Sequence, residues 1–418
     1  MKRRISGLFV LIILAQTLGT RGFPESLNIG LAEPITNLQS WVRDNRNSHW
    51  LFEFILNPFI SVVEFGIELV ESIFTWLPWF VPAIIVFALV ARTRRWGLAT
   101  FTAFAVIYPG VVGVWSESIV TISLMAVAVF ICVLIGVPLG VVAALNHRVE
   151  SALRPILDGM QTVPATVYLI PIVLLFGIGP APAAIATVIY ALPPMVRLTT
   201  LGIQQVPKSA VEAAQMFGAT KRQILAKVQL PLAVPSIITG INQTVMMALG
   251  IVVIATLVGA GGLGQEINQT VRRLEPGRGL IVSLAVVAVA LVLDRVFMSL
   301  VSTPGARRIR VKRNTLYMSL IGLALLAIAG RLLGWVEFPF SWGTSFADPI
   351  DSGFKWFRTT FNVVTRPFND FIVREILVRA QTLFNETITW QAVVVVAAAF
   401  AFYVAGWKLS LFTACGVT

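Results

Sequence analysis

Charged residues are scarce in this sequence, and that scarcity excludes most kinds of soluble protein. Only 12% of the 418 residues are charged and 57% are hydrophobic, whereas about 25% of the residues in a typical soluble domain are charged. A soluble chain of this size needs a charged surface that the composition does not supply. With two cysteines and two histidines, disulfide frameworks, zinc centres and haem ligation are excluded as well. A polytopic membrane protein is the class that remains.

The sequence also lacks the motifs of ATP binding and of common catalytic sites. No segment matches G-x-x-x-x-G-K-[ST], the loop that cradles ATP phosphates. The apolar segments contain no paired acid and base and no nucleophile beside a base. We therefore expect no enzyme activity, metal or cofactor in this chain. Any energy for transport must then come from a partner or from an ion gradient.

Apolar runs of the length that crosses a membrane recur along the chain. The first follows Lys2-Arg3-Arg4, which also fits a cleaved signal peptide, but no cleavage site is evident and a later copy of the pattern favours a retained helix. If every run spans, the basic loops fall on the cytoplasmic side with the N-terminus, except the loop around Arg272 and Arg278. The expected spans cover residues 5–18, 77–90, 96–114, 119–145, 163–178, 181–196, 235–258, 280–302, 316–333 and 392–404.

Residues 23–76 do not have the composition of a membrane span, because glutamates and aromatic residues are interspersed along them. From Val62 to Ile73 the apolar and acidic residues recur at helical spacing. An amphipathic helix at the outer membrane interface fits this pattern, and so does a helix packed on neighbouring spans.

The sequence after Arg313 repeats the start of the chain. The matching segments keep their order with small gaps and lie roughly 310 residues apart. An even number of spans in the first unit would give both copies the same orientation. The matches pair Phe23-Pro24 with Phe338-Pro339, Ala32-Glu33-Pro34-Ile35 with Ala347-Asp348-Pro349-Ile350, Trp41-Val42-Arg43 with Trp356-Phe357-Arg358, and residues 96–103 with residues 407–414.

These observations predict five regions. A first transmembrane helix (1–22) precedes the extracytoplasmic or interfacial segment (23–76) and two further spans (77–115). A core transmembrane domain (116–304) contains a long cytoplasmic loop at 205–235. Residues 305–418 are expected to be a partial second copy of the N-terminal region, as in a tandem duplication.

The first half of the loop at 205–235 has the pattern of a short capped helix. Ser209 and Glu212 have the spacing of a capping box. Gly218 can end this helix in a left-handed conformation. We expect the helix to lie between these two signals.

The second half of the loop repeats the pattern. Thr220 and Gln223 form the next expected capping box, and Pro231 is expected to stop the helix. Two capped helices on a basic loop form a compact knob that fits a cleft in a cytoplasmic partner. A DNA-reading helix-turn-helix has similar local signals, but the place of the loop between two spans argues against nucleic acid.

The spacing in this loop resembles the EAA loop of ABC importer permeases: Glu-Ala-Ala, three residues, Gly, nine residues, an aliphatic residue, one residue, Leu-Pro. In that family the loop is the coupling helix that seats in a separate ATPase subunit, so the resemblance implies a coupling role for the matching positions. A valine stands where the family more often has isoleucine. The matching residues are Glu212, Ala213, Ala214, Gly218, Val228, Leu230 and Pro231.

Further segments resemble the quaternary-amine branch, the glycine betaine/proline betaine permeases. The resemblance implies an all-α membrane bundle of the type I importer class in a prokaryotic inner or plasma membrane, in contact with lipid. It also implies two ATPase subunits, an extracytoplasmic substrate-binding protein and a second permease unit, either a second copy or a tandem one. The resembling segments are residues 160–169, 175–179, 191–197, 227–233, 242–244 and 259–264.

Prolines and aromatic residues in the apolar segments are candidates for the substrate pathway. Prolines are expected to interrupt the helices and expose backbone groups to a substrate, and aromatic faces attract quaternary ammonium groups. Packed kinks and interfacial belt residues explain the same positions without a substrate. The candidates are Pro164, Tyr168, Tyr190, Pro193 and Pro194.

The sequence thus predicts the permease of an ATP-driven importer of glycine betaine, proline betaine or a related compatible solute. Choline, carnitine or another amine is an alternative cargo. An ion-driven secondary carrier would need ionisable groups deep in the membrane, and few are present. A membrane scaffold or osmosensor without transport is the remaining alternative.

Overall fold

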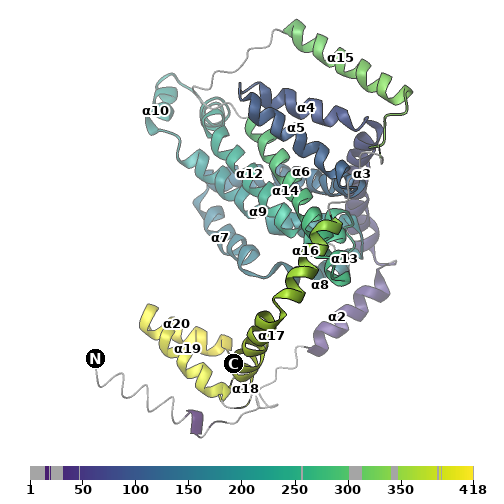
Figure 1. The fold of residues 1–418 in the computed structure, drawn as a ribbon. Helices are drawn as coiled ribbons and strands as arrows, with labels where there is room; N and C mark the ends of the chain where they lie inside the picture. Colours follow the sequence, from purple (N-terminus) through teal and green to yellow (C-terminus); the bar gives the residue numbers. More distant parts are fainter. Residues whose placement is uncertain are drawn as a thin grey trace. The chain divides into compact units, whose positions relative to one another are not determined.

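The computed structural model describes residues 15–17, 19, 32–46, 48–255, 258–300, 313–339, 347–383, 386 and 388–417. In these residues all regular structure is helical, as expected. The chain divides into two compact units, residues 41–354 and residues 1–40 together with 355–418 (Figure 1). The expected first span at residues 5–18 lies almost wholly outside the described residues, and so does the basic segment at 301–312.

The centre of the larger unit is α9 (Pro180–Gln204), which packs between α6 (Trp115–Leu145) and α12 (Leu230–Ala255) (Figure 1). Glycines allow these helices to approach closely. A Cβ atom on Gly140 of α6 would lie 2.8 Å from the carbonyl oxygen of Val196, and one on Gly202 would lie 2.6 Å from the Cβ of Ser236. Small residues at such contacts let membrane helices pack backbone to backbone.

A helical hairpin flanks this centre. It consists of α4 (Phe80–Ala91) and α5 (Trp96–Val111), which pack on α14 (Pro276–Leu300). The helix α13 (Gly262–Arg273) precedes α14 and packs against α6. Buried side chains from α6, α12, α13 and α14 form one apolar cluster that includes Met125, Val245, Leu263 and Val282.

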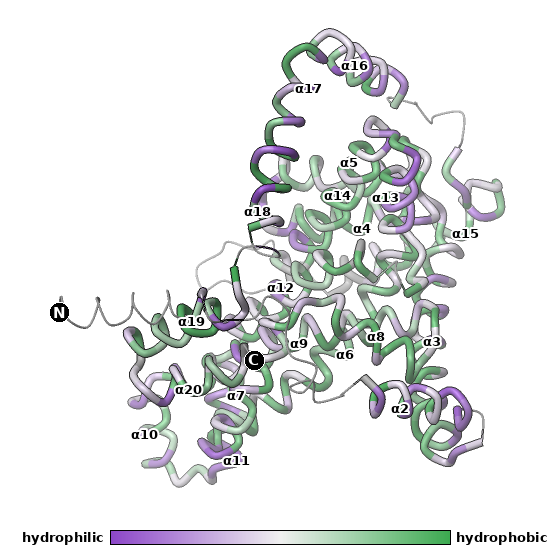
Figure 2. The backbone as a smooth tube through the Cα atoms, turned by 90° about the horizontal axis from the view of Figure 1, so that it is seen from below, coloured by the Kyte–Doolittle hydropathy of each residue, from purple (hydrophilic) through white to green (hydrophobic). Residues whose placement is uncertain are grey.

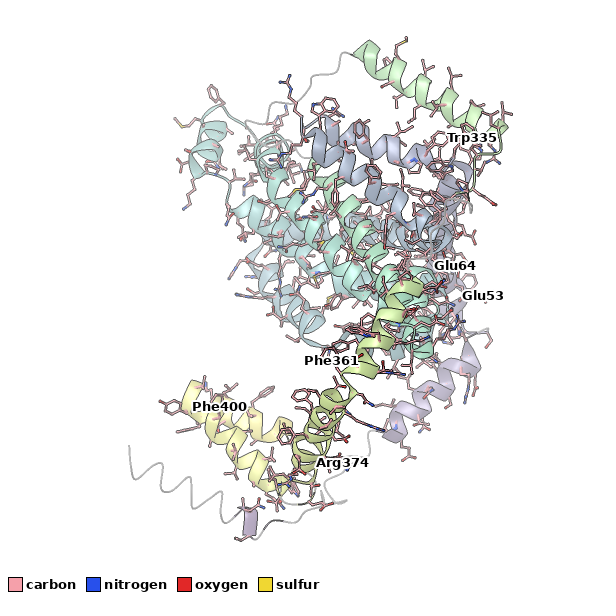
Figure 3. All side chains as sticks on the ribbon, viewed as in Figure 1. Glu53, Glu64, Trp335, Phe361, Arg374 and Phe400 are labelled. Carbon is pink, nitrogen blue, oxygen red and sulfur yellow. The ribbon has the colours of Figure 1, made fainter. Side chains whose placement is uncertain are left out.

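The segment from residue 52 to residue 76 is helical. A π turn, η2 (Phe52–Leu56), leads into α3 (Asn57–Trp76), whose Val63 and Ile67 are buried in a cluster with residues of α6 and α9. Glu53 and Glu64 lie on its exposed side (Figure 3). Packing on neighbouring helices, one of the two alternatives for this segment, is therefore present; a position at the membrane interface stays a prediction.

The prediction that prolines interrupt the apolar helices is wrong for most of them. Pro138 lies inside α6, and Pro193 and Pro194 lie inside α9, and both helices continue through them. Among the prolines named as candidates, Pro164 alone stands at a break, between α7 (His147–Thr162) and α8 (Ala165–Phe176), where the chain bends by 100°. Helices in an apolar environment tolerate proline because neighbouring groups and local adjustments satisfy the freed carbonyl.

Every span expected between residues 77 and 302 coincides with a helix, although lengths differ. Within the described residues, four helices are long and apolar enough to cross a membrane, and two sharply bent pairs, α3–α4 and α7–α8, would raise the number to six. The helix at the third expected span, α5, has 16 residues. The larger unit also contains α15 (Arg313–Leu332), whose Gly330 lies against Phe80 of α4.

Some of the matched segments form similar helices, while the duplication itself stays a prediction. The matched alanines Ala32 and Ala347 open α2 (Ala32–Asn45) and α16 (Ala347–Thr360), which both have 14 residues. Each of these two helices crosses the boundary between the units. The hairpin α4–α5 has a counterpart in α19 (Trp390–Ala405) and α20 (Trp407–Val417), and matched tryptophans, Trp96 and Trp407, open the second helix of each hairpin.

In the smaller unit, a long helical segment precedes that second hairpin. It runs through α17 (Asn362–Asp370), η6 (Phe371–Val378) and α18 (Arg379–Thr382). Its side chains, including Phe361 and Arg374, are exposed (Figure 3). The hydroxyl of Thr389 donates to the carbonyl oxygen of Ala15 at 2.9 Å, which ties the start of α19 to the N-terminal part of the same unit.

Candidate functional site

The loop at 205–235 forms the expected pair of helices outside the apolar bundle. They are α10 (Lys208–Met216) and α11 (Lys221–Ile224), and Figure 2 shows hydrophilic and hydrophobic colours mixed along them, in contrast to the mainly hydrophobic α6. We call residues 208–224 the coupling knob. Gly218 lies between its two helices with a φ of +74°, and its N–H donates to the carbonyl oxygen of Gln215 at 2.9 Å. The predicted left-handed end of the first helix is confirmed.

The capping predictions for the knob have different outcomes. The second box is present: the N–H of Thr220 donates to Oε1 of Gln223 at 2.9 Å, and the N–H of Gln223 donates to Oγ1 of Thr220. The first box, between Ser209 and Glu212, is wrong. The helix α10 already begins at Lys208, after an N-cap residue, Pro207, that makes no side-chain cap. Ser209 therefore lies inside the first turn, where its hydroxyl cannot act as the N-cap.

The prediction that Pro231 stops the second helix is also wrong. The chain passes from α11 through a π turn, η3 (Leu225–Gln229), directly into α12, and residues 221–251 behave as one helix of 31 residues. The N–H of Leu230 donates to the carbonyl oxygen of Leu225, five residues back. A π turn widens the helix at the point where the ring of Pro231 would otherwise meet the preceding turn. The second half of the loop is therefore one end of a helix that is long and apolar enough to cross a membrane.

The surface of the knob combines a polar side with an apolar end. Glu212 and Ala213 are exposed, and Ala214 is half-buried. Met216 and Phe217, which we call the coupling tip, are 88% and 92% exposed at the end of α10. Neither residue of the tip was predicted as a site residue; two large apolar side chains at the end of a polar helix were the available signal. Val228 and Leu230 are half-buried and Pro231 is exposed.

The knob follows directly from α9, and two contacts join α9 to α7 just before it. Nε2 of Gln204, the last residue of α9, donates to Oε2 of Glu150 at 3.1 Å. Arg197 forms an ion pair with Asp158 of α7. These groups surround a polar cavity of about 360 Å³ between the two helices. The amphipathic α7 is thus linked to the same helix that enters the knob.

The predicted pathway residues occupy different environments. Pro164 is exposed at the α7–α8 break. The hydroxyl of Tyr168 in α8 reaches back across this break and lies 2.6 Å from the carbonyl oxygen of Met160 and 2.5 Å from that of Val163. Tyr190 is half-buried, and Pro193 and Pro194 are buried in α9. The structure therefore does not bring these five residues together on one surface.

A different surface has the character expected of a pathway. In the apolar stretch of the helix that contains α12, only 17% of the residues are buried, whereas 67% are buried in the apolar stretch of α9. One exposed face of α12, the α12 stripe, combines polar, small and flexible residues at helical spacing. Thr239 and Gln243 are its polar members, and sequence analysis missed them although they stand out in an apolar span at i and i+4. The stripe comprises Leu232, Pro235, Thr239, Gln243, Met246 and Gly250.

Two glycine turns meet at the opposite end of the bundle from the knob. Gly259 and Gly262 have φ values of +85° and +69°, and the N–H of Gly179 donates to the carbonyl oxygen of Val258 at 2.8 Å. The N–H of Leu263 donates to Oγ1 of Thr121 at 2.9 Å, which fixes the start of α13 on α6. A structural turn therefore accounts for these glycines.

Comparison with known proteins identifies the family. Residues 136–303 match the binding-protein-dependent transport system inner membrane component. The glycine betaine/carnitine transport permease protein GbuB of Listeria monocytogenes is 40% identical over 266 residues, which cover 63% of this chain and 94% of that protein.

Two other relatives are longer than the region they share with this chain. The glycine betaine/proline betaine transport system permease protein ProW of Escherichia coli is 49% identical over 214 residues, 51% of this chain and 60% of ProW. The trimethylamine N-oxide transport system permease protein TmoV of Pelagibacter ubique is 29% identical over 369 residues, 81% of this chain and 51% of TmoV. The chain spans about half to three fifths of the length of these two relatives. With GbuB matched over nearly its whole length, this chain belongs to the family of binding-protein-dependent transport system inner membrane components.

Proposed function

We propose that this chain is the transmembrane permease of an ATP-driven importer of glycine betaine, proline betaine or a related compatible solute. The observation that carries the proposal is the coupling knob, an exposed pair of helices continuous with a membrane helix. The names of the relatives support the cargo, because ProW and GbuB are permeases for betaines and TmoV is one for trimethylamine N-oxide. Choline and carnitine remain alternative cargoes of the same chemical class.

The knob is suited to receive force from a cytoplasmic ATPase. Its tip, Met216 and Phe217, offers a large apolar area that water leaves when a cleft closes over it. The helix from Lys221 to Ile251 would then move as a rod about 46 Å long. A displacement of the knob is thereby transmitted to the membrane part of α12 without an intervening flexible joint.

The α12 stripe is the part of the proposal that concerns the substrate. A glutamine side chain facing hydrocarbon leaves its amide without hydrogen bonds, which is unfavourable. We assign Thr239 and Gln243 to a pathway formed with a second permease unit, in place of the scattered prolines and tyrosines. A zwitterionic solute has no net charge, so polar groups such as these can line its pathway without a charged side chain.

The orientation follows from the loops. The knob and the basic turn at residues 92–95 share the cytoplasmic side with the N-terminus when the positive loops are inside. The glycine turns near residues 177–179 and 259–262 then lie at the outer mouth, where a substrate-binding protein would deliver the solute. Specificity for one amine over another would rest mainly on that protein.

The test is uptake by proteoliposomes that contain the chain, its ATPase and its binding protein. We expect uptake of labelled glycine betaine that requires ATP and continues after an uncoupler removes ion gradients. Phe217→Asp should lower the affinity for the ATPase about thirtyfold or more, because an exposed aromatic that becomes buried at an interface contributes about 2 kcal/mol or more. Leu274→Asp, at an 83% exposed leucine on the outer side, is the matched control and should bind normally.

Each alternative predicts another result. Uptake that stops with the uncoupler while ATP is intact would identify an ion-driven carrier. A chain that copurifies with no ATPase and transports nothing would be a scaffold. If wild type and Phe217→Asp bind the ATPase with equal affinity, the coupling tip does not contribute to ATPase binding.

A further inference from the structure

A cavity in the larger unit has no part in the coupling or pathway just described. It has a volume of about 340 Å³ and lies between the α4–α5 hairpin and the helices α6 and α14. Leu89, Val106, Ile122 and Val292 are among its lining residues. Its polar lining is confined to Ser118, whose hydroxyl already donates to the carbonyl oxygen of Val114 at 2.7 Å.

This lining excludes water and polar solutes as stable occupants. A buried water needs two to four polar partners, and a purely apolar cavity stays dry. An empty cavity of this size would deprive its walls of dispersion contacts that protein interiors normally have. The helices around it are apolar, with no charged residue in α4 or α5, so the surrounding medium is the hydrocarbon of the bilayer.

A second pocket of about 460 Å³, lined in part by Phe338, adjoins the outer end of the cavity and shares Trp115 and Ile119 with it. Phe338 is 7% exposed, and its ring lies so close to Gly110 that a Cβ atom there would overlap it. The ring centroid of Phe338 is 5.1 Å from that of Trp79 and 6.1 Å from that of Trp115, which itself lines the cavity. The lining of that outer pocket includes the carboxylates Glu117 and Glu337, which repel an anionic head group, so an anionic occupant of the cavity is favoured toward the inner side.

The inner end lies beside a group of positive charges. Arg92, Arg94 and Arg95 form the turn between α4 and α5, one helical turn beyond Leu89. Their side chains are exposed and make no ion pair among the described residues. Arg295 is adjacent to the lining residue Val296; its Nε lies 3.6 Å from Oδ2 of Asp294 and makes no hydrogen bond with the described residues.

We propose that this cavity, the acyl slot, binds one acyl chain of an anionic glycerophospholipid of the inner leaflet. The phosphate of that lipid pairs with the arginines of the α4–α5 turn. An apolar slot adjoining unpaired guanidinium groups matches the two parts of such a lipid, and inner leaflets rich in anionic lipid attract basic segments near the membrane surface. The proposal needs the α4–α5 turn to be cytoplasmic but does not depend on the cargo or the ATPase.

The experiment measures bound lipid. The full chain is purified from membranes in mild detergent, and the phospholipids that remain attached are counted and identified by native mass spectrometry. Wild type should retain one phospholipid with an anionic head group. Val292→Phe places a phenyl ring in the slot, in the way of the acyl chain, and should lose this lipid. Val287→Phe adds the same bulk five residues earlier on α14, at a valine that is 58% exposed, and should retain it.

A second arm starts from wild type after delipidation, so that its first comparison does not depend on the folding of a variant. Phosphatidylglycerol should rebind several-fold more tightly than phosphatidylcholine with the same acyl chains. The triple variant Arg92→Gln, Arg94→Gln, Arg95→Gln should bind both lipids equally, whereas Arg272→Gln with Arg273→Gln on the other side should preserve the preference. Retention of the lipid by Val292→Phe at the wild-type level, or equal binding of the two lipids by wild type, would overturn the proposal.

Discussion

Gly218 separates the two helices of the coupling knob through its backbone alone. Its φ of +74° lies in the left-handed region, and a Cβ atom at this position would meet no atom within 4 Å. A substitution here therefore acts by conformational strain and not by collision. The residue fixes the angle at which α10 presents the coupling tip.

The strain predicts a difference between two substitutions at this position. Gly218→Val should destabilise the turn by about 1–2 kcal/mol, because a β-branched residue is strongly disfavoured in a left-handed conformation. Gly218→Asn should be tolerated, because asparagine adopts that conformation more readily. The measurement is the rate of ATP-dependent uptake at equal amounts of inserted protein. If the valine variant transports as fast as the asparagine variant, the angle of the knob has no role.

At the scale of elements, the close contact of α6 with α9 makes a second prediction. A leucine at Gly140 would meet Thr199 and the backbone of Val196, and overpacking of this kind costs about 1–3 kcal/mol. Gly140→Leu should therefore lower the thermal unfolding temperature of the detergent-solubilised protein.

Gly322 provides the control for that measurement. It lies in α15, another apolar helix, and a Cβ atom there would meet nothing within 4 Å. Gly322→Leu should leave the unfolding temperature unchanged. Equal effects of the two substitutions would mean that α6 and α9 do not pack through Gly140.

The sequence predicted the helices well where their position depends on a single property of neighbouring residues. Apolar length located α6, α9, α12 and α14 to within a few residues at most ends, and the Thr220–Gln223 box is present as expected. Pro231 shows where such reasoning fails, because proline ends a regular α-helix but a preceding π turn removes the collision.

The candidate site was predictable in part for a related reason. The spacing of Glu212 and Gly218 located the knob, since it depends on neighbours in sequence. The exposure of Phe217 and of Gln243 depends on which faces the other helices leave uncovered. That information exists only once α9 and α12 are packed together, so the coupling tip and the α12 stripe were missed.

At the scale of the whole molecule, the proposed pathway along the α12 stripe requires a second permease unit. We expect the stripes of two units to face each other across the pathway. Gln243→Cys, in a Cys415→Ser background, should then form a disulfide between two copies under mild oxidation. Cys132 is fully buried and should not react.

The control for this cross-link is Val287→Cys on the exposed face of α14, which should remain monomeric on a non-reducing gel. Cross-linking of both variants to the same extent would indicate random collision. Its absence at position 243 with intact transport would place the partner unit on another face.

Phe338 packs on Trp79 and Trp115 beside the proposed acyl slot, and in the sequence its match is Phe23. If residues 305–418 are the expected second copy, the leading segment of one repeat packs on the helices of the repeat before it. We then expect the first repeat to reach its final packing only after the ribosome has synthesised the segment around Phe338, so that folding of the two repeats is coupled in time.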